Sequence, residues 1–303
     1  MNTHDFSGLS VALATPFGAN GAIDEAGFRR LVRHVVGGGA DVLVVLGSTG
    51  EAATLEEPER DALIRWTLEE AQGRPVVAGC GSSATAQAAR WCARAQELGC
   101  TGALVVTPPY NKPMPAGILA HFEACAKAAP GLPLIVYNVP GRTGQNLSPQ
   151  TLARLWKQPQ VIAVKESSGD LGQIAEIARA LPTCKTLLAG DDPLALSSIA
   201  VGAQGLVSVM GNILPREAKA LVDAARAGDL TTARQWQHRL RPVIDALFCE
   251  SNPIPLKAAL AELGIAGDAV RLPLTPPEAT TRTRIQTVLE PFRNQDHHAH
   301  HEA

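Results

Sequence analysis

The stretch Val161–Ile162–Ala163–Val164–Lys165–Glu166–Ser167–Ser168–Gly169 places a lysine directly after an apolar run. Such a run predicts a buried β-strand, and parallel strands with helices on both sides are buried on both faces. A lysine at the end of that strand lies in a low dielectric, which disfavours its protonated form. A neutral amine can attack a carbonyl carbon and form a Schiff base. The alternative is a structural lysine that extends to solvent or pairs with Glu166.

Short apolar runs of the same kind recur along the chain and alternate with helical patterns. One helical pattern, Ala88 to Leu98, places apolar side chains at the spacing of a single helix face. Eight such repeats before residue 230 fit a closed parallel barrel better than a doubly wound sheet, which usually has about five or six strands. The predicted strands are Val11–Thr15, Val42–Leu46, Val76–Gly79, Ala103–Thr107, Leu134–Asn138, Val161–Lys165, Thr186–Gly190 and Gly205–Val209.

The chain after residue 229 has helical patterns and no further predicted strand. These patterns cover Thr231–Phe248, Leu256–Leu263 and Pro276–Leu289. We therefore predict a (β/α)8 TIM barrel over residues 1–229 and a small helical domain over residues 230–303. The histidine-rich tail, Asp296–Glu302, is predicted to be disordered and is assigned no function.

Composition indicates an ordinary globular protein. The 303 residues include 27 basic and 29 acidic side chains, so no electrostatic argument favours nucleic acid or an anionic membrane. No apolar run approaches the roughly 20 residues of a membrane span, and the start, Met1–Asp5, lacks signal-peptide features. We therefore expect a cytoplasmic location. The six cysteines include no C-x-x-C pair, which favours reduced thiols over a disulfide frame or a zinc site.

Three motifs suggest ligands but fail on their context. Gly79–Ala84 satisfies G-x-G-x-x-A, yet the next predicted strand ends without the acid that a dinucleotide ribose needs. Asp191–Asp192 could be a metal pair, but Asp192 before Pro193 is typical of a helix N-cap. The run Gly37–Gly39 precedes its strand, so it is interpreted as a helix stop.

In a (β/α)8 barrel the active site lies at the C-terminal ends of the strands. Both tyrosines of the chain, Tyr110 and Tyr137, fall at this face together with Lys165. Buried tyrosines usually pack with one satisfied hydroxyl, but beside a Schiff-base lysine a phenol can move protons to and from the carbinolamine. The hydroxyls of Ser48 or Thr49, after the second predicted strand, could continue this proton relay.

Arg142 follows the fifth predicted strand in a glycine-containing loop. A guanidinium there can bind a substrate carboxylate through two parallel hydrogen bonds. A loop salt bridge is the alternative, and position alone does not separate the two.

Six motifs resemble, in order and spacing, the dihydrodipicolinate (4-hydroxy-tetrahydrodipicolinate) synthase family of the pyruvate-dependent class I aldolases. The resemblance runs from Gly8 to about Pro291, and the arginine after Y-N-V-P-G points to this branch of the superfamily. The motifs are Gly47–Ser48–Thr49–Gly50–Glu51, Thr107–Pro108–Pro109–Tyr110–Asn111, Tyr137–Asn138–Val139–Pro140–Gly141–Arg142–Thr143, Val164–Lys165–Glu166, Gly190–Asp191–Asp192 and Asn252–Pro253–Ile254–Pro255–Leu256–Lys257.

The resemblance implies condensation of pyruvate with L-aspartate 4-semialdehyde in diaminopimelate and lysine biosynthesis. It implies a homodimer or a homotetramer built as a dimer of dimers, and neither a cofactor nor a metal beyond the imine itself. Carried over position by position, the resemblance implies that Lys165 forms the pyruvate imine and that Tyr137 is the central proton shuttle, which Thr49 links to Tyr110 from the neighbouring subunit. It implies that Arg142 holds the semialdehyde carboxylate. It also implies that Ser48 contacts the pyruvate carboxylate and that backbone around Gly190 and Val207 lines the pyruvate pocket.

Two alternatives stay open at this point. An aldolase or dehydratase of a 2-keto-3-deoxy sugar acid or of 4-hydroxy-2-oxoglutarate would keep Lys165 and Tyr137, but it is not expected to carry the Arg142 pattern. A catalytically silent barrel that binds keto acids could keep the fold without the chemistry.

The resemblance also bears on regulation by lysine. Lysine-sensitive members use an asparagine, an acid, an aromatic side chain and often histidines in an effector pocket at the dimer interface. The matching positions here hold Ser83, Gln87, Pro109, Glu57 and Arg60. We therefore expect no inhibition by lysine at physiological concentrations.

Overall fold

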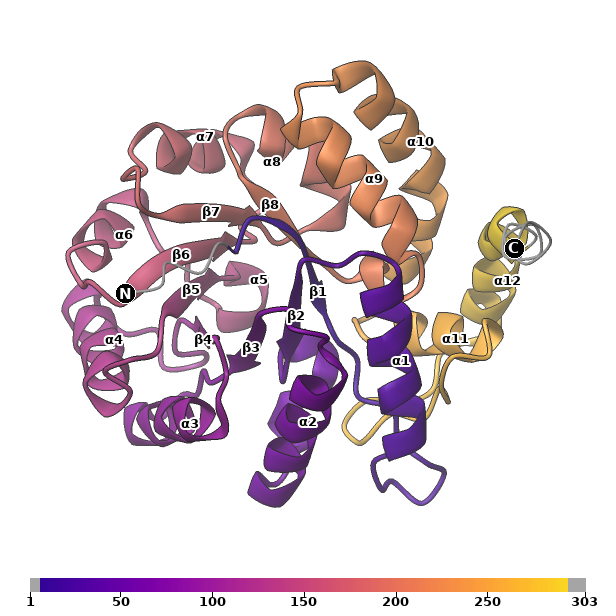
Figure 1. Cartoon of the computed structure of the whole chain (residues 1–303), viewed down its shortest axis with the longest axis horizontal. Coiled ribbons are helices and arrows are strands. Elements are labelled where there is room, and N and C mark those ends of the chain that lie inside the picture. The colour runs from indigo at the N-terminus through magenta and orange to yellow at the C-terminus, as the bar shows by residue number, and fades with distance from the viewer. Residues whose placement is uncertain (1–5, 294–303) are drawn as a thin grey trace.

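The computed structural model describes residues 6–293, and its core is a closed barrel of parallel strands. The strands follow one another around the barrel in chain order, and β8 closes it by pairing with β1 (Figure 1). This confirms the predicted (β/α)8 barrel. The strands are β1 (Gly8–Ala12), β2 (Val42–Val45), β3 (Val76–Gly79), β4 (Gly102–Val106), β5 (Leu134–Asn138), β6 (Val161–Glu166), β7 (Thr186–Ala189) and β8 (Gly205–Ser208).

Helices surround the strands, and α11 and α12 lie together at one side of the barrel (Figure 1). The α-helices are α1 (Glu25–Gly37), α2 (Glu57–Glu70), α3 (Thr85–Leu98), α4 (Pro115–Ala128), α5 (Pro140–Thr143), α6 (Pro149–Leu155), α7 (Leu171–Arg179), α8 (Ala195–Ala200), α9 (Pro215–Arg226), α10 (Leu230–Leu247), α11 (Ile254–Glu262) and α12 (Ala279–Arg293). Short 3-10 turns are η1 (Ser48–Gly50), η2 (Ala52–Thr54), η3 (Asp192–Leu194) and η4 (Met210–Asn212).

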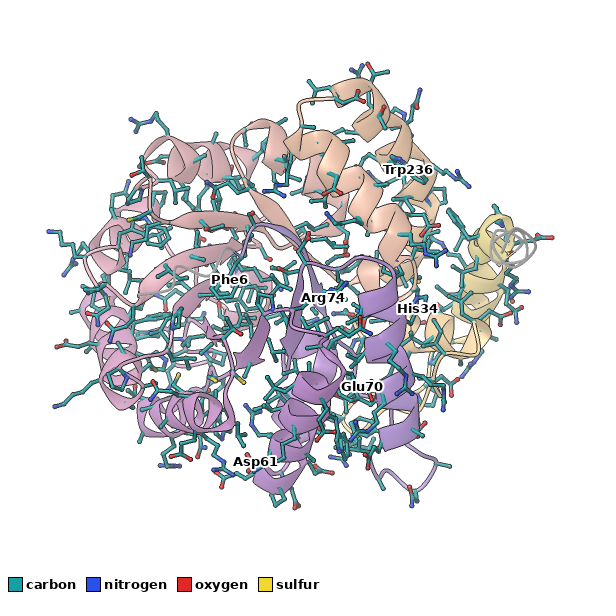
Figure 2. All side chains as sticks on the ribbon, viewed as in Figure 1. Phe6, His34, Asp61, Glu70, Arg74 and Trp236 are labelled. Atoms are coloured by element: carbon teal, nitrogen blue, oxygen red, sulfur yellow. The ribbon has the colours of Figure 1, made fainter. Side chains whose placement is uncertain are left out.

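Two apolar layers hold the barrel together, as expected for strands whose side chains alternate between two faces. The larger layer lies between strands and helices, and the smaller one fills the barrel interior. Phe6, which precedes β1 and is fully buried, belongs to the interior layer (Figure 2). Its position before β1 places it at the N-terminal end of the barrel. Active sites of such barrels lie at the opposite, C-terminal end of the strands.

The first strand differs most from its prediction, whereas β2, β4, β6, β7 and β8 differ by one residue at one or both ends. Val11–Thr15 was the expected segment, but β1 is Gly8–Ala12. Register explains the shift, because Gly8 pairs with Gly205 of β8 and Ser10 pairs with Val42 of β2. Residues 13 to 15 are as buried as the strand itself, so apolarity alone places the strand too late.

The C-terminal helices follow the predicted order, with boundaries shifted by one or two residues in α10 and α11 and by more in α12. The last helix was expected over Pro276–Leu289, whereas α12 runs from Ala279 to Arg293. The two prolines at 276 and 277 precede the helix, as expected for residues that cannot supply backbone N–H groups. The proposed division at residue 230 coincides with the first residue of α10, which packs against α9. The histidine-rich tail lies outside the described residues.

The structure also bears on the glycine run, the cysteines and the question of membrane-spanning helices. The glycines after α1 end that helix, with Gly38 donating to His34 O and Gly39 at a positive φ of 90°. All six cysteines are free thiols. No helix within residues 6–293 is long and apolar enough to cross a membrane.

Candidate active site

Lys165 and Tyr137 lie side by side at the C-terminal end of the barrel. They are register partners on β6 and β5, and both are almost fully buried. The Lys165 Nζ atom is 4.2 Å from the centroid of the Tyr137 ring. None of the ion pairs or hydrogen bonds within residues 6–293 involves the Lys165 amine, so it is not the paired structural lysine of the alternative interpretation.

Glu166, the neighbour of Lys165, faces the other side of the strand. Its carboxylate accepts hydrogen bonds from Asn138 Nδ2 at 3.0 Å and from the Ser168 N–H at 2.8 Å. Burial raises the pKa of Glu166, and these hydrogen bonds oppose the shift. Successive side chains on a strand point to opposite faces, which separates this acid from the lysine.

The wall beside Lys165 is built from backbone and small side chains. A Cβ atom added at Gly190 would lie 1.8 Å from Ser167 Oγ and 3.0 Å from Lys165 Cε, so only glycine fits there. Val207 is buried on β8 in the same interior layer as Tyr137. The absence of a side chain at Gly190 therefore lets the chain pass close to Ser167 and Lys165.

Two acids, Asp191 and Asp192, follow β7. The sequence Asp192–Pro193 suggested that Asp192 caps the N-terminus of a helix, but its carboxylate has other partners. Asp192 is the first residue of η3, and its carboxylate accepts from Ser208 Oγ at 2.5 Å and from the Val209 N–H at 2.9 Å. The N-cap interpretation is wrong, because these donors from the end of β8 capture the side chain. Burial raises the pKa of Asp191 and Asp192, and the nearby charge of Lys165 partly opposes this.

The turn after β2 carries Ser48 and Thr49. Ser48 is partly exposed, whereas Thr49 is buried and its hydroxyl accepts a hydrogen bond from Asn252 Nδ2 at 2.9 Å. A second contact fixes the turn from the other side, since Thr15 Oγ1 donates to Gly50 O at 2.8 Å. The bond from Asn252 occupies a lone pair of the Thr49 oxygen and leaves the hydroxyl proton free to point elsewhere.

A buried ion pair anchors the same turn to the C-terminal region. Glu51, in the left-handed conformation at a φ of 52°, pairs with Lys257 of α11 and accepts from the Arg271 N–H at 3.0 Å. Lys257 also donates to Ala269 O at 2.8 Å and lies 4.0 Å from the centroid of the Phe17 ring. Burial lowers the pKa of Lys257 to about 8, although the Glu51 carboxylate opposes this shift. The helices after the barrel therefore hold the turn that carries Thr49.

Arg142 lies at the mouth, on the short helix α5. Its Nη2 donates to Asn252 O at 3.0 Å, and no ion pair within residues 6–293 involves its exposed guanidinium. The loop salt bridge that the sequence left open is therefore not formed within the described residues. A cavity of about 290 Å³ at the ends of β2 to β5 is lined by Arg142, Ser48 and Tyr137, among others.

Tyr110 is separate from the other candidate residues. Its side chain is 90% exposed, and its backbone has a φ of 71°, which is rare outside glycine. The Tyr110 N–H donates to Thr143 O at 3.2 Å, which ties its loop to α5. Within one chain, the structure brings Tyr110 to the same face as Tyr137 but presents its phenol to the outside.

Comparisons with known proteins agree with this arrangement. Residues 5–291 match the model of the dihydrodipicolinate synthetase family. The chain belongs to this family. Among similar relatives, one from Geotalea daltonii is 43% identical over 95% of this chain and 99% of the relative, and one from Exiguobacterium sp. is 45% identical over 95% and 98%. Both are named 4-hydroxy-tetrahydrodipicolinate synthase. A dihydrodipicolinate synthase structure from Aquifex aeolicus superposes with a TM-score of 0.92 and 38% identity, covering 95% of this chain and 98% of that one.

The sequence interpretation missed one contact in the candidate site of this dihydrodipicolinate synthetase family member. Asn252 was quoted as part of a motif and given no role, yet it bonds the Thr49 side chain and the Arg142 guanidinium at once. The available signal was the Asn252–Pro253 pair between two helical patterns. No sequence spacing connects residue 252 with residue 49, so only the fold reveals the contact.

Proposed function

We propose that this protein is a 4-hydroxy-tetrahydrodipicolinate synthase, a lyase that condenses pyruvate with L-aspartate 4-semialdehyde. The observation that carries the proposal is the Lys165 amine, unpaired within residues 6–293, against the Tyr137 ring at the barrel mouth. The names of the relatives support this reaction over the sugar-acid aldolase and over a silent barrel.

The pyruvate half of the reaction uses Lys165. Its neutral amine attacks the ketone carbon, and loss of water from the carbinolamine gives an imine. The imine withdraws electrons, so that a proton can leave the methyl carbon and give an enamine. Tyr137 is placed to carry these protons, since its ring is in contact with the lysine chain and its hydroxyl has no partner within residues 6–293.

The second half joins the enamine carbon to the aldehyde carbon of the semialdehyde. The new carbon–carbon bond leaves an alkoxide, which takes a proton from the relay. Attack of the amino nitrogen on the imine carbon then closes the ring and releases Lys165. Arg142 would bind the semialdehyde carboxylate, because its guanidinium lies at the mouth with only one hydrogen bond to backbone.

We further propose that Tyr110 serves the site of a neighbouring subunit. An aromatic side chain that is 90% exposed beside the active-site mouth fits a position buried only in an assembly. Thr49 would then connect Tyr137 with the partner's phenol. The choice between homodimer and homotetramer stays a prediction, as do the cytoplasmic location and the division of the chain at residue 230.

No cofactor is part of this proposal, because the imine itself supplies the electron withdrawal. The residues 6–293 contain no group of three His, Cys, Asp or Glu side chains placed to hold a metal ion.

Reductive trapping tests the nucleophile. Borohydride added with pyruvate should convert the imine to a stable secondary amine and add its mass to the peptide that contains Lys165. Lys185 and Lys257 are also buried lysines and serve as internal controls in the same digest. Lys165→Arg should give no adduct, since arginine stays protonated. An adduct on another lysine, or normal turnover by Lys165→Ala, would refute the mechanism.

Substrate turnover tests the second half. Pyruvate consumption should start when aspartate semialdehyde is added and should be far slower with sugar aldehydes of similar size. Trapping at Lys165 combined with faster turnover of a sugar aldehyde would retain the nucleophile and overturn the synthase assignment.

A further inference from the structure

Glu166 and Asn138 are register partners at the ends of β6 and β5, directly after the register pair Lys165 and Tyr137. Both side chains are buried, with exposed fractions of 1% and 0%. Successive side chains of a strand point to opposite faces, so the acid and the amide lie on the side of the strands away from the amine and the phenol. They therefore adjoin these two groups through the backbone and not through the cavity at the mouth.

The Asn138 amide joins Glu166 to the segment after α5. Its Nδ2 atom donates to both carboxylate oxygens of Glu166 at 3.0 Å and to Asn146 Oδ1 at 2.8 Å. Its Oδ1 atom accepts from the Leu147 N–H at 2.9 Å. Both polar atoms of this amide are therefore used, and the segment that follows Arg142 is tied to the end of β5.

Glu166 also holds the turns that follow β6 and β7. The Ser168 N–H donates to its Oε1 atom at 2.8 Å. A main-chain bond from the Gly190 N–H to Glu166 O, at 2.9 Å, adds the end of β7. Glu166 is therefore bonded to β5, which carries Tyr137, and to Gly190, which borders the Lys165 side chain.

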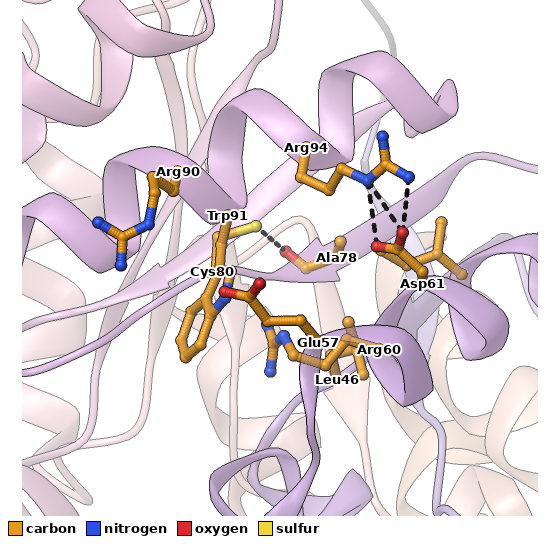
Figure 3. A pocket seen from close by; sticks show the side chains of 10 residues that line it. Leu46, Glu57, Arg60, Asp61, Ala78, Cys80, Arg90, Trp91 and Arg94 are labelled. Carbon is orange, nitrogen blue, oxygen red and sulfur yellow. Dashed lines mark hydrogen bonds and ion pairs between the residues drawn. The ribbon is translucent and has the colours of Figure 1, made fainter.

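The Glu166 carboxylate has no cationic partner within residues 6–293. By contrast, Asp61 is paired with Arg94 at 2.6 Å (Figure 3), and the buried Glu51 is paired with Lys257. The groups that donate to Glu166 are all neutral amides and hydroxyls. A buried carboxylate that only neutral donors hold costs stability, so the geometry that it imposes is the better explanation for its place here.

We propose that Glu166 and Asn138 form a positioning pair, which holds the Lys165 amine and the Tyr137 phenol in the register that proton transfer requires. The two carboxylate oxygens accept the same NH2 group at equal distances, so sliding or separation of the ends of β5 and β6 would break these bonds. A misplacement of about 1 Å can lower a rate by about a hundredfold. The inference rests on the proposed function, because it concerns how the same Lys165 site works.

Exchange of the pyruvate methyl protons for deuterium, followed by NMR, tests the pair without the semialdehyde. The exchange requires the imine and the enamine, and therefore Lys165 and Tyr137, but no second substrate. Glu166→Gln has nearly the same volume but turns an NH2 group toward that of Asn138, which leaves two donors facing each other. We expect it to slow exchange at saturating pyruvate about tenfold or more, with a smaller change in the pyruvate concentration for half-maximal exchange.

A swapped variant separates a positioning role from a loss of stability. Asn138→Asp combined with Glu166→Gln restores a donor that faces an acceptor, and it keeps acceptors for the N–H groups of Leu147 and Ser168. Exchange should recover to within about threefold of that of the unmodified chain. As a control, Asp170→Ala removes the N-cap of α7, just after β6, without touching the pair. It should lower the unfolding temperature and change exchange less than about twofold.

Normal exchange in Glu166→Gln would overturn the positioning role, as would a swapped variant that unfolds at the wild-type temperature but exchanges as slowly as Glu166→Gln. Where Glu166→Gln does not fold, Asn146→Ala removes an exposed acceptor of the Asn138 amide and should slow exchange about threefold, and no effect there overturns the role as well. No exchange by the unmodified chain would refute the pyruvate chemistry together with the pair's part in it. Normal exchange without consumption of the semialdehyde would refute the synthase assignment alone.

Discussion

Removing the side chain of Asn252 should slow the chemical step without impairing pyruvate capture. In the structure its Nδ2 donates to Thr49 Oγ1 at 2.9 Å inside a buried environment. This bond keeps the Thr49 proton from pointing at Asn252 and leaves it for the proposed relay. An unsatisfied buried hydroxyl costs about 1–3 kcal/mol, which corresponds to a decrease in kcat of roughly 5- to 150-fold for Asn252→Ala.

The isosteric variant Asn252→Asp sharpens this prediction. A carboxylate only accepts hydrogen bonds, so the Thr49 proton would turn toward it and away from the relay. Asn252→Asp should therefore lower kcat at least as much as Asn252→Ala. Arg142 bonds the backbone carbonyl of residue 252, which both variants keep, so the KM for the semialdehyde should change less than kcat.

A double-mutant cycle with Thr49→Val decides whether Asn252 acts through Thr49. In the Thr49→Val background the Asn252→Ala change should cost little further kcat, because the group that it orients is gone. Steady-state kinetics and borohydride trapping are measured on all four proteins, with thermal unfolding as the control for folding. Additive losses in kcat, or a wild-type kcat in Asn252→Asp, would refute the orienting role.

Four further predictions follow from the site and its supports. Arg142→Ala should leave pyruvate trapping intact and weaken semialdehyde use by about 1.5–3 kcal/mol in kcat/KM, whereas equal damage to both substrates would indicate a structural role. Tyr110→Phe and Tyr137→Phe proteins should each be slow, but mixed dimers should recover activity after subunit exchange; no recovery despite proven exchange would place both phenols in one chain. Lysine should not inhibit at physiological concentrations, because the buried guanidinium of Arg60 repels its ammonium and the acid expected from the resemblance is missing; sub-millimolar inhibition in an activity titration would contradict this. Between pH 8 and about 10.5, Lys257 should be protonated less often in the folded chain than in the unfolded chain, because its folded-state pKa is lowered. The free energy of unfolding, compared with that of Lys257→Met, should therefore rise with pH by up to about 3 kcal/mol. A difference between the two proteins that stays constant with pH in denaturant unfolding would contradict the lowered pKa.

The sequence predicts the barrel well because each strand carries its own local signal. β3 and β5 have the predicted bounds, since turn residues and charged residues flank each apolar run. The predicted bounds of β1 are wrong, because the start of this strand is fixed by pairing with β8, which lies far away along the chain. Burial of residues 13 to 15 outside the strand imitates a strand signal.

The residues of the candidate site also fall into those that a local pattern predicts and those that only the fold brings together. Lys165 and Tyr137 could be placed because strand ends define the chemical face of a barrel. Asp192 was misread, because its carboxylate bonds β8 and not its own helix. The support from Asn252 to Thr49 joins positions that no local pattern relates. Tyr110 is exposed in the single chain, so its role rests on the proposed neighbouring subunit.

Three buried lysines differ in what holds their amines. Lys185 precedes β7 and donates to Val161 O at 2.6 Å, while Lys257 is held by Glu51 and by Ala269 O. Burial alone therefore does not distinguish a reactive amine, since each of these side chains is at most 8% exposed. Lys165 differs because it lies near the C-terminal end of its strand instead of preceding one, and no acceptor within residues 6–293 binds its amine. An amine that no ion pair or carbonyl oxygen holds can turn toward the carbonyl carbon of a substrate. Strand direction therefore separates Lys165 from Lys185, and the ion pair with Glu51 separates it from Lys257, which supports Lys165 as the proposed nucleophile.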